Sequence, residues 1–133
     1  MRRRSIVVPG LEHGSNPIPA ASRRGPLLAT GGVRGVDRES GVLPADAGEQ
    51  VRHAFANLRA VVEAGGGTVE DVVHVTVFAA ADVRAAVNEE WVRMFPDAGS
   101  RPARHLLRQE LPGGMLVQLE ALAFVMEDRE SDG

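Results

Sequence analysis

The chain contains no cysteine, no lysine and no tyrosine among its 133 residues. The lack of cysteine excludes disulfides, thiolate metal sites and cysteine nucleophiles. The lack of lysine excludes catalysis through a lysine Schiff base. Because only 4% of the residues are aromatic, a stacking surface for single-stranded bases is not expected.

Long apolar segments and a concentrated positive charge are also missing. No apolar run approaches the roughly 20 residues that a membrane-spanning helix needs, and the apolar run before Pro9 is too short for a secretory signal. Fifteen basic and 18 acidic residues give a formal net charge of -3, which disfavours nonspecific nucleic-acid binding. We therefore expect a cytoplasmic protein with no membrane or nucleic-acid partner.

The chain length fits one domain, since domains commonly contain about 100 to 150 residues. We expect a single domain over residues 1–133, with flexible termini at 1–4 and 127–133. The tail EDRESDG at 127–133 is highly charged, which is typical of disorder.

The first half of the chain predicts short strands and one long helix. Strands are expected at 5–8, at 26–30 and, with a turn, at 33–44, and the Pro- and Gly-rich segment 11–25 predicts a loop. The helix is expected between Asp46, a plausible N-cap, and the glycines at 65–67. Its apolar stripe recurs at helical spacing and comprises Val51, Ala54, Phe55, Leu58, Val61 and Val62.

The second half predicts the centre of a sheet. The β-branched run 72–78 indicates a central strand that is covered on both faces. Strands are also expected at 104–109 and 115–126. A helix from about 82 to 95 should bury a stripe comprising Val83, Ala86, Val87, Trp91 and Met94.

This order of elements predicts an α+β domain in which two helices cover one face of a mixed sheet. The last strand, 115–126, is apolar on both faces, but the chain supplies no third helix for the second face. Burial against other copies of the chain is the economical solution, so we expect a homo-oligomer. The alternative is a β-sandwich-like closure within one chain.

Histidine, serine and glycine patterns give no recognised catalytic or metal motif. The four histidines share no ligand spacing such as i, i+4 on a helix, so no metal site is expected. They are His13, His53, His74 and His105. A G-x-S-x-G nucleophile elbow and a phosphate-binding glycine loop followed by lysine are both missing.

Arginine and a polar pair on the last strand remain as candidates for chemistry. Arg101, Arg104, His105 and Arg108 crowd the segment before that strand. Gln118 and Glu120 lie two residues apart and so share one strand face, where buried polar groups need partners. From this pattern alone, an Arg–Glu ion pair across an oligomer interface is favoured over a ligand-binding arginine.

Longer motifs resemble the reactive intermediate deaminase family, also called the Rid or YjgF family of enamine/imine deaminases. They lie in order from about residue 16 to 125 and read NPIPAASRRGPLLATGG, GEQVRHAFANLRAVVEAGGGTVEDVVHVTVF, VNEEWVRMFP and RPAR…LPGGMLVQLEALA. The resemblance implies a chorismate-mutase-like α+β domain that forms a homotrimer with clefts between subunits, and no cofactor is expected.

The resemblance also assigns site residues. Arg104 of the RPAR motif should bind the substrate carboxylate, and a guanidinium suits a carboxylate because it can donate two parallel hydrogen bonds. Other positions implied in the substrate cleft are Ile18, Thr30, Gly31, Asn88 and Leu106.

Three positions depart from the family pattern. Gln118 stands where the family usually has a glutamate that positions the attacking water, whereas Glu120 matches a second, more structural glutamate. Ile18 replaces a loop tyrosine. The segment from Arg104 to Leu111 is one residue shorter than usual, which could shift Arg104 relative to the cleft.

These features predict hydrolysis of a small 2-imino or enamine acid to a 2-keto acid and ammonia, as in a 2-iminobutanoate/2-iminopropanoate deaminase, with Arg104 and Gln118 as catalytic residues. Glutamine can orient water but cannot accept its proton at neutral pH, so weakened activity is expected. The alternatives are a non-catalytic protein that binds small carboxylates and a deaminase-like enzyme for a different, pathway-specific imine. A ribonuclease is least favoured, because the chain is acidic and no general-base histidine pair is evident.

Overall fold

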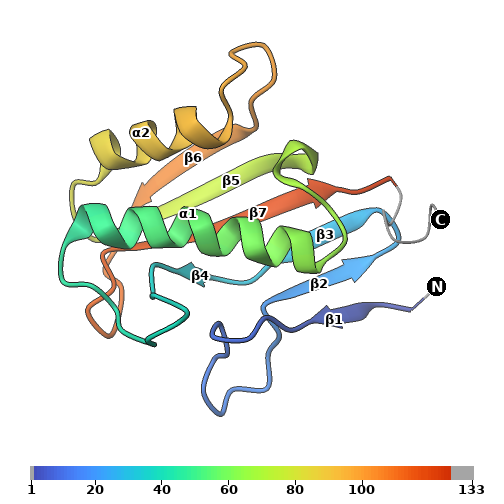
Figure 1. Ribbon diagram of the computed structural model, residues 1–133, viewed down its shortest axis with the longest axis horizontal. Coiled ribbons are helices and arrows are strands. Elements are labelled where there is room, and N and C mark those ends of the chain that lie inside the picture. Colours follow the sequence, from blue (N-terminus) through green and yellow to red (C-terminus); the bar gives the residue numbers. More distant parts are fainter. Residues whose placement is uncertain (1, 127–133) are drawn as a thin grey trace.

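The protein folds as a mixed β-sheet with both long helices on one face (Figure 1). The computed structural model describes residues 2–126. Within them the strand order is β1-β2-β3-β7-β5-β6, and β4 also pairs with β7. The strands are β1 (Arg4–Ile6), β2 (Ala21–Arg24), β3 (Leu27–Thr30), β4 (Val33–Arg34), β5 (Val72–Ala79), β6 (Ala103–Arg108) and β7 (Val117–Phe124). This arrangement confirms the predicted α+β class and differs from the sandwich alternative.

The first helix, α1 (Ala47–Ala64), begins and ends where the sequence predicts. Asp46 caps it, because its Oδ2 accepts a hydrogen bond of 2.9 Å from the Glu49 amide. The chain leaves the helix through Gly65 and then Gly66, whose φ of 93° is the left-handed conformation that glycine adopts without strain. A short 3₁₀ turn, η1 (Val69–Asp71), then leads into β5.

The second helix, α2 (Arg84–Met94), connects the two parallel strands of the sheet. β5 and β6 pair in parallel, whereas β7 runs antiparallel to β3, β4 and β5. A parallel pair needs a crossover connection, and α2 provides it on the same sheet face as α1 (Figure 1). α2 is shorter than the predicted 82–95, but Val83, Val87 and Trp91 are buried as expected.

Two predictions for the N-terminal third were wrong. Residues 11–25, which were expected to form a loop, contain β2, whose polar sequence ASRR does not indicate a strand. Arg23 is buried in it, and its guanidinium donates hydrogen bonds to the carbonyls of Gly65 and Val125, so burial leaves this charge solvated by the backbone.

The predicted strand at 33–44 is limited to the two residues of β4. The buried Asn57 side chain donates hydrogen bonds of 2.8 Å to the carbonyls of both Arg34 and Val36. These two hydrogen bonds tie the end of β4 and the residues after it to α1, and the segment continues as a loop. Arg4, predicted in a flexible terminus, begins β1; the tail 127–133 lies outside the described residues.

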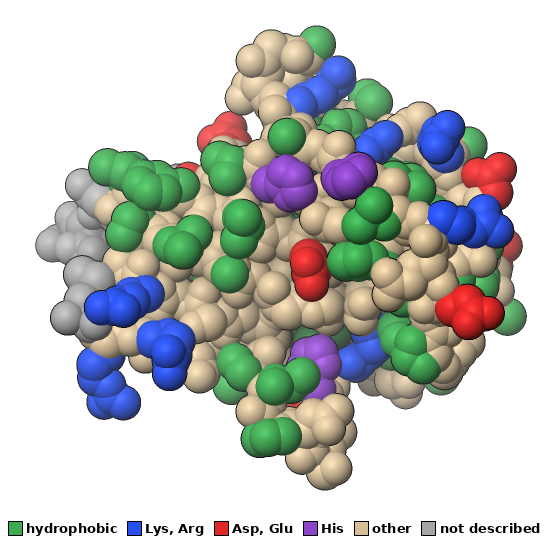
Figure 2. Space-filling view, turned by 180° about the vertical axis from the view of Figure 1, so that it is seen from behind, with side chains coloured by type: hydrophobic (Ala, Val, Ile, Leu, Met, Phe, Trp, Pro, Cys, Tyr) green, Lys and Arg blue, Asp and Glu red, His purple; other side chains and the backbone are tan. Residues whose placement is uncertain are grey.

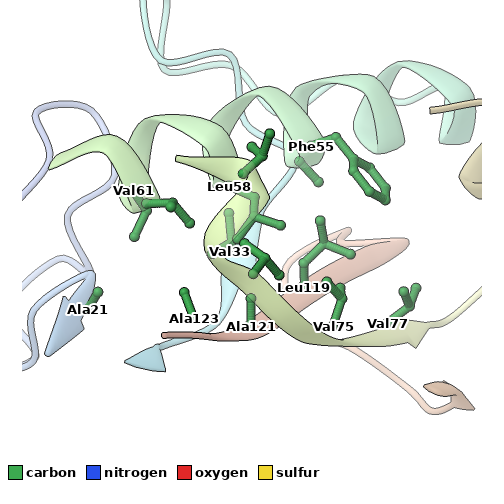
Figure 3. Close-up of a cluster of buried hydrophobic side chains, with 14 of the residues drawn as sticks. Ala21, Val33, Phe55, Leu58, Val61, Val75, Val77, Leu119, Ala121 and Ala123 are labelled. Carbon is green, nitrogen blue, oxygen red and sulfur yellow. The ribbon is translucent and has the colours of Figure 1, made fainter. Parts of the chain in front are cut away.

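The hydrophobic core lies between the two helices and the sheet. Figure 3 shows side chains of α1, including Phe55 and Leu58, lying over Val75, Val77 and Leu119 of β5 and β7. All five are at most 2% exposed. This interdigitated layer corresponds to the apolar stripe that the sequence predicts for the first helix.

The other face of the sheet is not covered by any described residue. Along β7 buried residues alternate with less buried ones, and Leu122 and Phe124 are 44% and 49% exposed. Figure 2 shows hydrophobic side chains gathered on this side of the molecule. The predicted burial of both strand faces is therefore not achieved within one chain. We call this surface the open face, and the helix side the covered face.

Candidate functional site

Arg104 lies on β6 at the edge of the sheet, on the covered face. It is the register partner of Val75, a fully buried core residue of β5. Because paired residues of neighbouring strands share a face, the Arg104 side chain is directed toward α2. Leu106, two residues further along β6, shares this face and is half-buried.

Two side chains of α2 contact the Arg104 guanidinium. Nη2 of Arg104 donates a hydrogen bond of 2.7 Å to Oδ1 of Asn88. The guanidinium carbon lies 4.9 Å from the centroid of the Trp91 ring, which is the geometry of a cation–π contact. The sequence predicts Asn88 as a site residue but identifies Trp91 only as part of the core.

The electrostatic surroundings of Arg104 are unusual for a partly buried cation. Burial lowers the pKa of Arg104 from its ordinary value, and the nearby positive charge of Arg84 lowers it further. Among residues 2–126, no aspartate or glutamate forms an ion pair with Arg104. Its described polar contact is a neutral amide, so the guanidinium retains donors suited to an external carboxylate.

The neighbouring arginines have different surroundings. Arg101 donates from Nε to the Phe95 carbonyl at 2.8 Å and from Nη2 to the Pro96 carbonyl at 3.4 Å, which ties the loop before β6 to the end of α2. Arg108 is exposed at the end of β6. Of the three arginines in this segment, Arg104 alone combines partial burial, an aromatic contact and a neutral hydrogen-bond partner.

Gln118 lies on the opposite face of the sheet from Arg104. Its register partner on β5 is Phe78, whereas the partner of Arg104 is Val75. Val75 and Phe78 are three residues apart on one strand, so their side chains point to opposite faces. Arg104 and Gln118 of the same chain therefore cannot contact one ligand together.

Thr30 ends β3, and Gly31 lies between it and Gly32, which the Gln118 side chain contacts. The Thr30 hydroxyl donates to the Gly31 carbonyl at 2.8 Å and accepts from the Ala121 amide at 2.9 Å. The Gln118 amide packs over the next glycine so closely that a Cβ on Gly32 would lie 2.4 Å from Nε2. The lack of a side chain at Gly32 therefore leaves the space that the Gln118 amide occupies beside the β3–β4 connection.

Ile18 lies in the loop that leads to this region. Its side chain is 55% exposed, and the loop continues to Ala20, whose carbonyl accepts a hydrogen bond from the Gly31 amide. The predicted site residues therefore form two groups within one chain. We call Asn88, Arg104 and Leu106 the arginine half, and Ile18, Thr30, Gly31 and Gln118 the glutamine half.

A polar row on the open face was not predicted as a unit. Thr76 of β5 is the register partner of Glu120 on one side and of His105 on the other. A hollow of about 250 Å³ is lined by Thr30, His74, Thr76, Glu120, Ala121 and Leu122. Strand parity predicts that Glu120 shares a face with Gln118, but the row of Glu120, Thr76 and His105 depends on the register of three strands.

Neither a metal cluster nor a membrane span is found in the described part of the chain. Within residues 2–126, no group of three or more histidine, aspartate or glutamate side chains is arranged to hold a metal ion. The same residues contain no helix long and apolar enough to cross a bilayer.

Comparison with known proteins defines the family. The model of the family described as Endoribonuclease L-PSP matches residues 15–125. The chain therefore belongs to this family. That result agrees with the motifs running from residue 16 to 125 and with the two-helix, mixed-sheet fold.

Individual relatives carry several names. A RutC family protein of Pasteurella multocida is 36% identical over 80% of this chain and 86% of its own length. The 2-iminobutanoate/2-iminopropanoate deaminase of Escherichia coli is 34% identical over 74% of this chain and 80% of its own. The Rid family protein YyfA of Yersinia pestis superposes with a TM-score of 0.84 at 26% identity, covering 93% of this chain and all of its own. The predicted resemblance to the Rid family is confirmed.

Proposed function

We propose that the protein is a hydrolytic deaminase of small 2-imino or enamine acids, with Arg104 as the residue that binds the substrate carboxylate. The observation that carries this proposal is the environment of Arg104, a partly buried guanidinium held by Asn88 and Trp91 with no described acidic partner. The deaminase named among the relatives supports the reaction class.

The proposed site lies between subunits of a homotrimer. Arg104 and Gln118 lie on opposite faces of one sheet, so one chain cannot supply both to one ligand. The open face also carries exposed apolar side chains that another copy would bury. An assembly that places the arginine half of one subunit against the glutamine half of the next satisfies both requirements.

The proposed chemistry uses few protein groups. Arg104 binds the carboxylate with parallel hydrogen bonds and orients the neighbouring imine carbon. Gln118 orients a water whose oxygen bonds to that carbon, while one proton of that water moves to the imine nitrogen. The carbon–nitrogen bond then breaks as the carbonyl forms and the hydroxyl proton moves to the departing amine, so a 2-keto acid and ammonia are released. Because an amide is not a general base at neutral pH, turnover should be modest.

A protein that binds small carboxylates without turnover is the second candidate, and the neutral Gln118 side chain favours it. The ribonuclease activity in the family description has less support in this chain. Its net charge is -3, whereas binding of a nucleic-acid backbone usually relies on concentrated positive charge.

The test is direct measurement of ammonia and keto acid released from a freshly generated 2-imino acid, together with calorimetry of keto-acid binding. Arg104→Ala should abolish binding and hydrolysis while the oligomer remains intact. Arg108→Ala is the matched control, because Arg108 lies on the same strand but is exposed, and it should retain both. Binding without accelerated ammonia release would replace the deaminase proposal by the carboxylate binder. A larger loss of binding in Arg101→Ala than in Arg104→Ala would show that the motif has been assigned to the wrong arginine.

A further inference from the structure

We infer that Trp91 is a positioning residue for Arg104 and acts together with Asn88. The inference rests on the proposed function for the nature of the ligand, a small carboxylate, but it concerns how the guanidinium is held. Asn88 and Trp91 lie three residues apart on α2 and therefore face the same way, toward the edge strand β6.

The Trp91 ring is fixed by its own neighbours. It is 8% exposed, and it meets the Phe55 ring edge-on with centroids 6.4 Å apart and the Phe95 ring with centroids 4.7 Å apart. Phe55 lies on α1 and Phe95 at the end of α2, so the Trp91 ring between them cannot turn without disturbing the core. The guanidinium therefore lies over a rigid surface rather than over a mobile side chain.

The two contacts hold Arg104 without consuming its charge. Asn88 accepts one hydrogen bond from Nη2, and Trp91 contacts the guanidinium through its ring. An arginine has five N–H donors, so most of them remain for a ligand. A carboxylate in the place of Asn88 would form an ion pair with Arg104 and compete with the substrate. The electron-rich face of an indole also favours the nearby positive charge, which opposes the effects of burial and of Arg84.

Trp91 also gives this site its own optical signal. It is the single tryptophan of the chain, and the chain has no tyrosine. Intrinsic fluorescence excited at the indole band therefore reports on a ring that touches Arg104. We expect titration with 2-oxobutanoate to change this emission in a saturable way in the wild type, and to leave it unchanged in Arg104→Ala.

Three variants separate positioning from simple packing. Trp91→Leu keeps an apolar side chain but loses the aromatic face, and it should weaken 2-oxobutanoate binding by about three- to tenfold. Trp91→Phe restores an aromatic face and should recover most of that loss. Asn88→Asp changes shape very little but places a carboxylate beside Arg104. It should weaken binding by more than about tenfold without lowering the unfolding temperature, since the added ion pair stabilises the fold.

The outcomes distinguish this inference from the proposed function. If the wild type binds 2-oxobutanoate but Trp91→Leu and Asn88→Asp bind it equally well, or if binding leaves the Trp91 emission unchanged, the positioning role is wrong and the proposed function stands. If the wild type binds no keto acid, the proposed function fails. The positioning role is then judged by the rate at which phenylglyoxal modifies Arg104, mapped by mass spectrometry. Compared with the wild type, that rate should change several-fold in Trp91→Leu and little in Trp91→Phe. Equal rates in the wild type and both Trp91 variants would overturn the inference.

Discussion

The covered face and the open face of the sheet differ in how much of their structure one chain completes. On the covered face α1 and α2 enclose a continuous core, and residues such as Val75 and Leu119 are fully buried. On the open face Leu122 and Phe124 are about half exposed, beside polar residues such as Glu120. Folding of a single chain therefore completes one face, whereas the other face is left for association in the proposed homotrimer.

The proposed site divides along the same line. The arginine half lies at the edge of the covered face, where helix packing fixes Asn88 and Trp91 around Arg104. In the glutamine half, Gln118 lies on the open face and packs against Gly32, and it has no hydrogen bond with a described side chain. Ligand binding is therefore expected to depend on the arginine half, and activation of the water on the glutamine half.

The largest effect is expected when Gln118 is replaced by a residue that can act as a general base. If a carboxylate at this position assists the attack of water, Gln118→Glu should raise imine hydrolysis by about 10²- to 10⁴-fold, the usual range for general acid–base assistance. A carboxylate in a partly dry cleft is tolerated when an arginine of the neighbouring subunit offsets its charge. The measurement is the rate of ammonia release at saturating imino acid.

The control for this variant is keto-acid binding, which depends on the arginine half and should stay unchanged. Unaltered hydrolysis in Gln118→Glu, with the oligomer intact and binding preserved, would count against the deaminase. It would favour the carboxylate binder or a different substrate class.

A substitution in the covered core tests the folding side of the comparison. Leu58→Ala removes a fully buried side chain that packs between α1 and the sheet. It should lower the free energy of unfolding by about 2 to 5 kcal/mol, because it loses burial and leaves a cavity. Denaturant titration measures this loss. Val92→Ala, a change at a side chain that is 51% exposed on α2, should cost about 0.5 kcal/mol or less.

A charge on the open face tests the association side. Light scattering of the wild type at micromolar concentration should give roughly three times the chain mass of 14.2 kDa. Leu122→Asp buries an unpaired carboxylate in any interface on this face, so the mass should fall toward that of one chain. Circular dichroism should show that the single chain keeps its helices. A stable wild-type monomer would contradict both the trimer and a site shared between subunits.

Mixed assemblies test whether the two halves meet across an interface. Arg104→Ala and Gln118→Leu chains should each be nearly inactive alone. When they are unfolded together and reassembled in equal amounts, about one quarter of the interfaces should pair an intact Arg104 with an intact Gln118, by random assortment in a closed ring. Hydrolysis should recover to about that fraction of the wild-type rate. No recovery, with mixed oligomers verified by mass spectrometry, would contradict a site that combines Arg104 of one subunit with Gln118 of the next.

The sequence predicts the helices well because their signals are local. The stripe from Val51 to Val62, the cap at Asp46 and the glycines that follow fix α1 without tertiary information. β2 escaped prediction because Arg23 reads as a surface residue, although three backbone carbonyls solvate it in the fold. Local polarity does not reveal a distant acceptor such as the Val125 carbonyl.

The site is only partly predictable for the same reason. Motif likeness identifies Arg104, Asn88 and Gln118, and strand parity places Gln118 and Glu120 on one face. The contact of Arg104 with Asn88 depends on the parallel crossover from β5 to β6 through α2. The separation of Arg104 from Gln118 depends on the registers of both strands against β5. Register is a property of the assembled sheet, because it depends on how the buried faces of different strands are matched, and the local pattern of one strand does not reveal it.

The smallest predicted effect concerns His13, at the border between the N-terminal loop and the covered face. Burial lowers the pKa of His13 below its ordinary value of 6.5, and the positive charge of Arg34 lowers it further. As the pH falls below about 6.5, the unfolded chain binds a proton at this position before the folded chain does. The unfolded state is thereby favoured, so the contribution of His13 to stability is present above pH 6.5 and is lost as the pH falls through its folded-state pKa.

His13→Gln removes this titration. The difference in free energy of unfolding between wild type and variant should therefore shift in favour of the variant between about pH 7.5 and pH 5.5, by no more than a few tenths of a kcal/mol because the site is partly exposed. A difference that stays constant over this range, or that shifts in favour of the wild type at low pH, would show that the loop does not hold His13 in its neutral form.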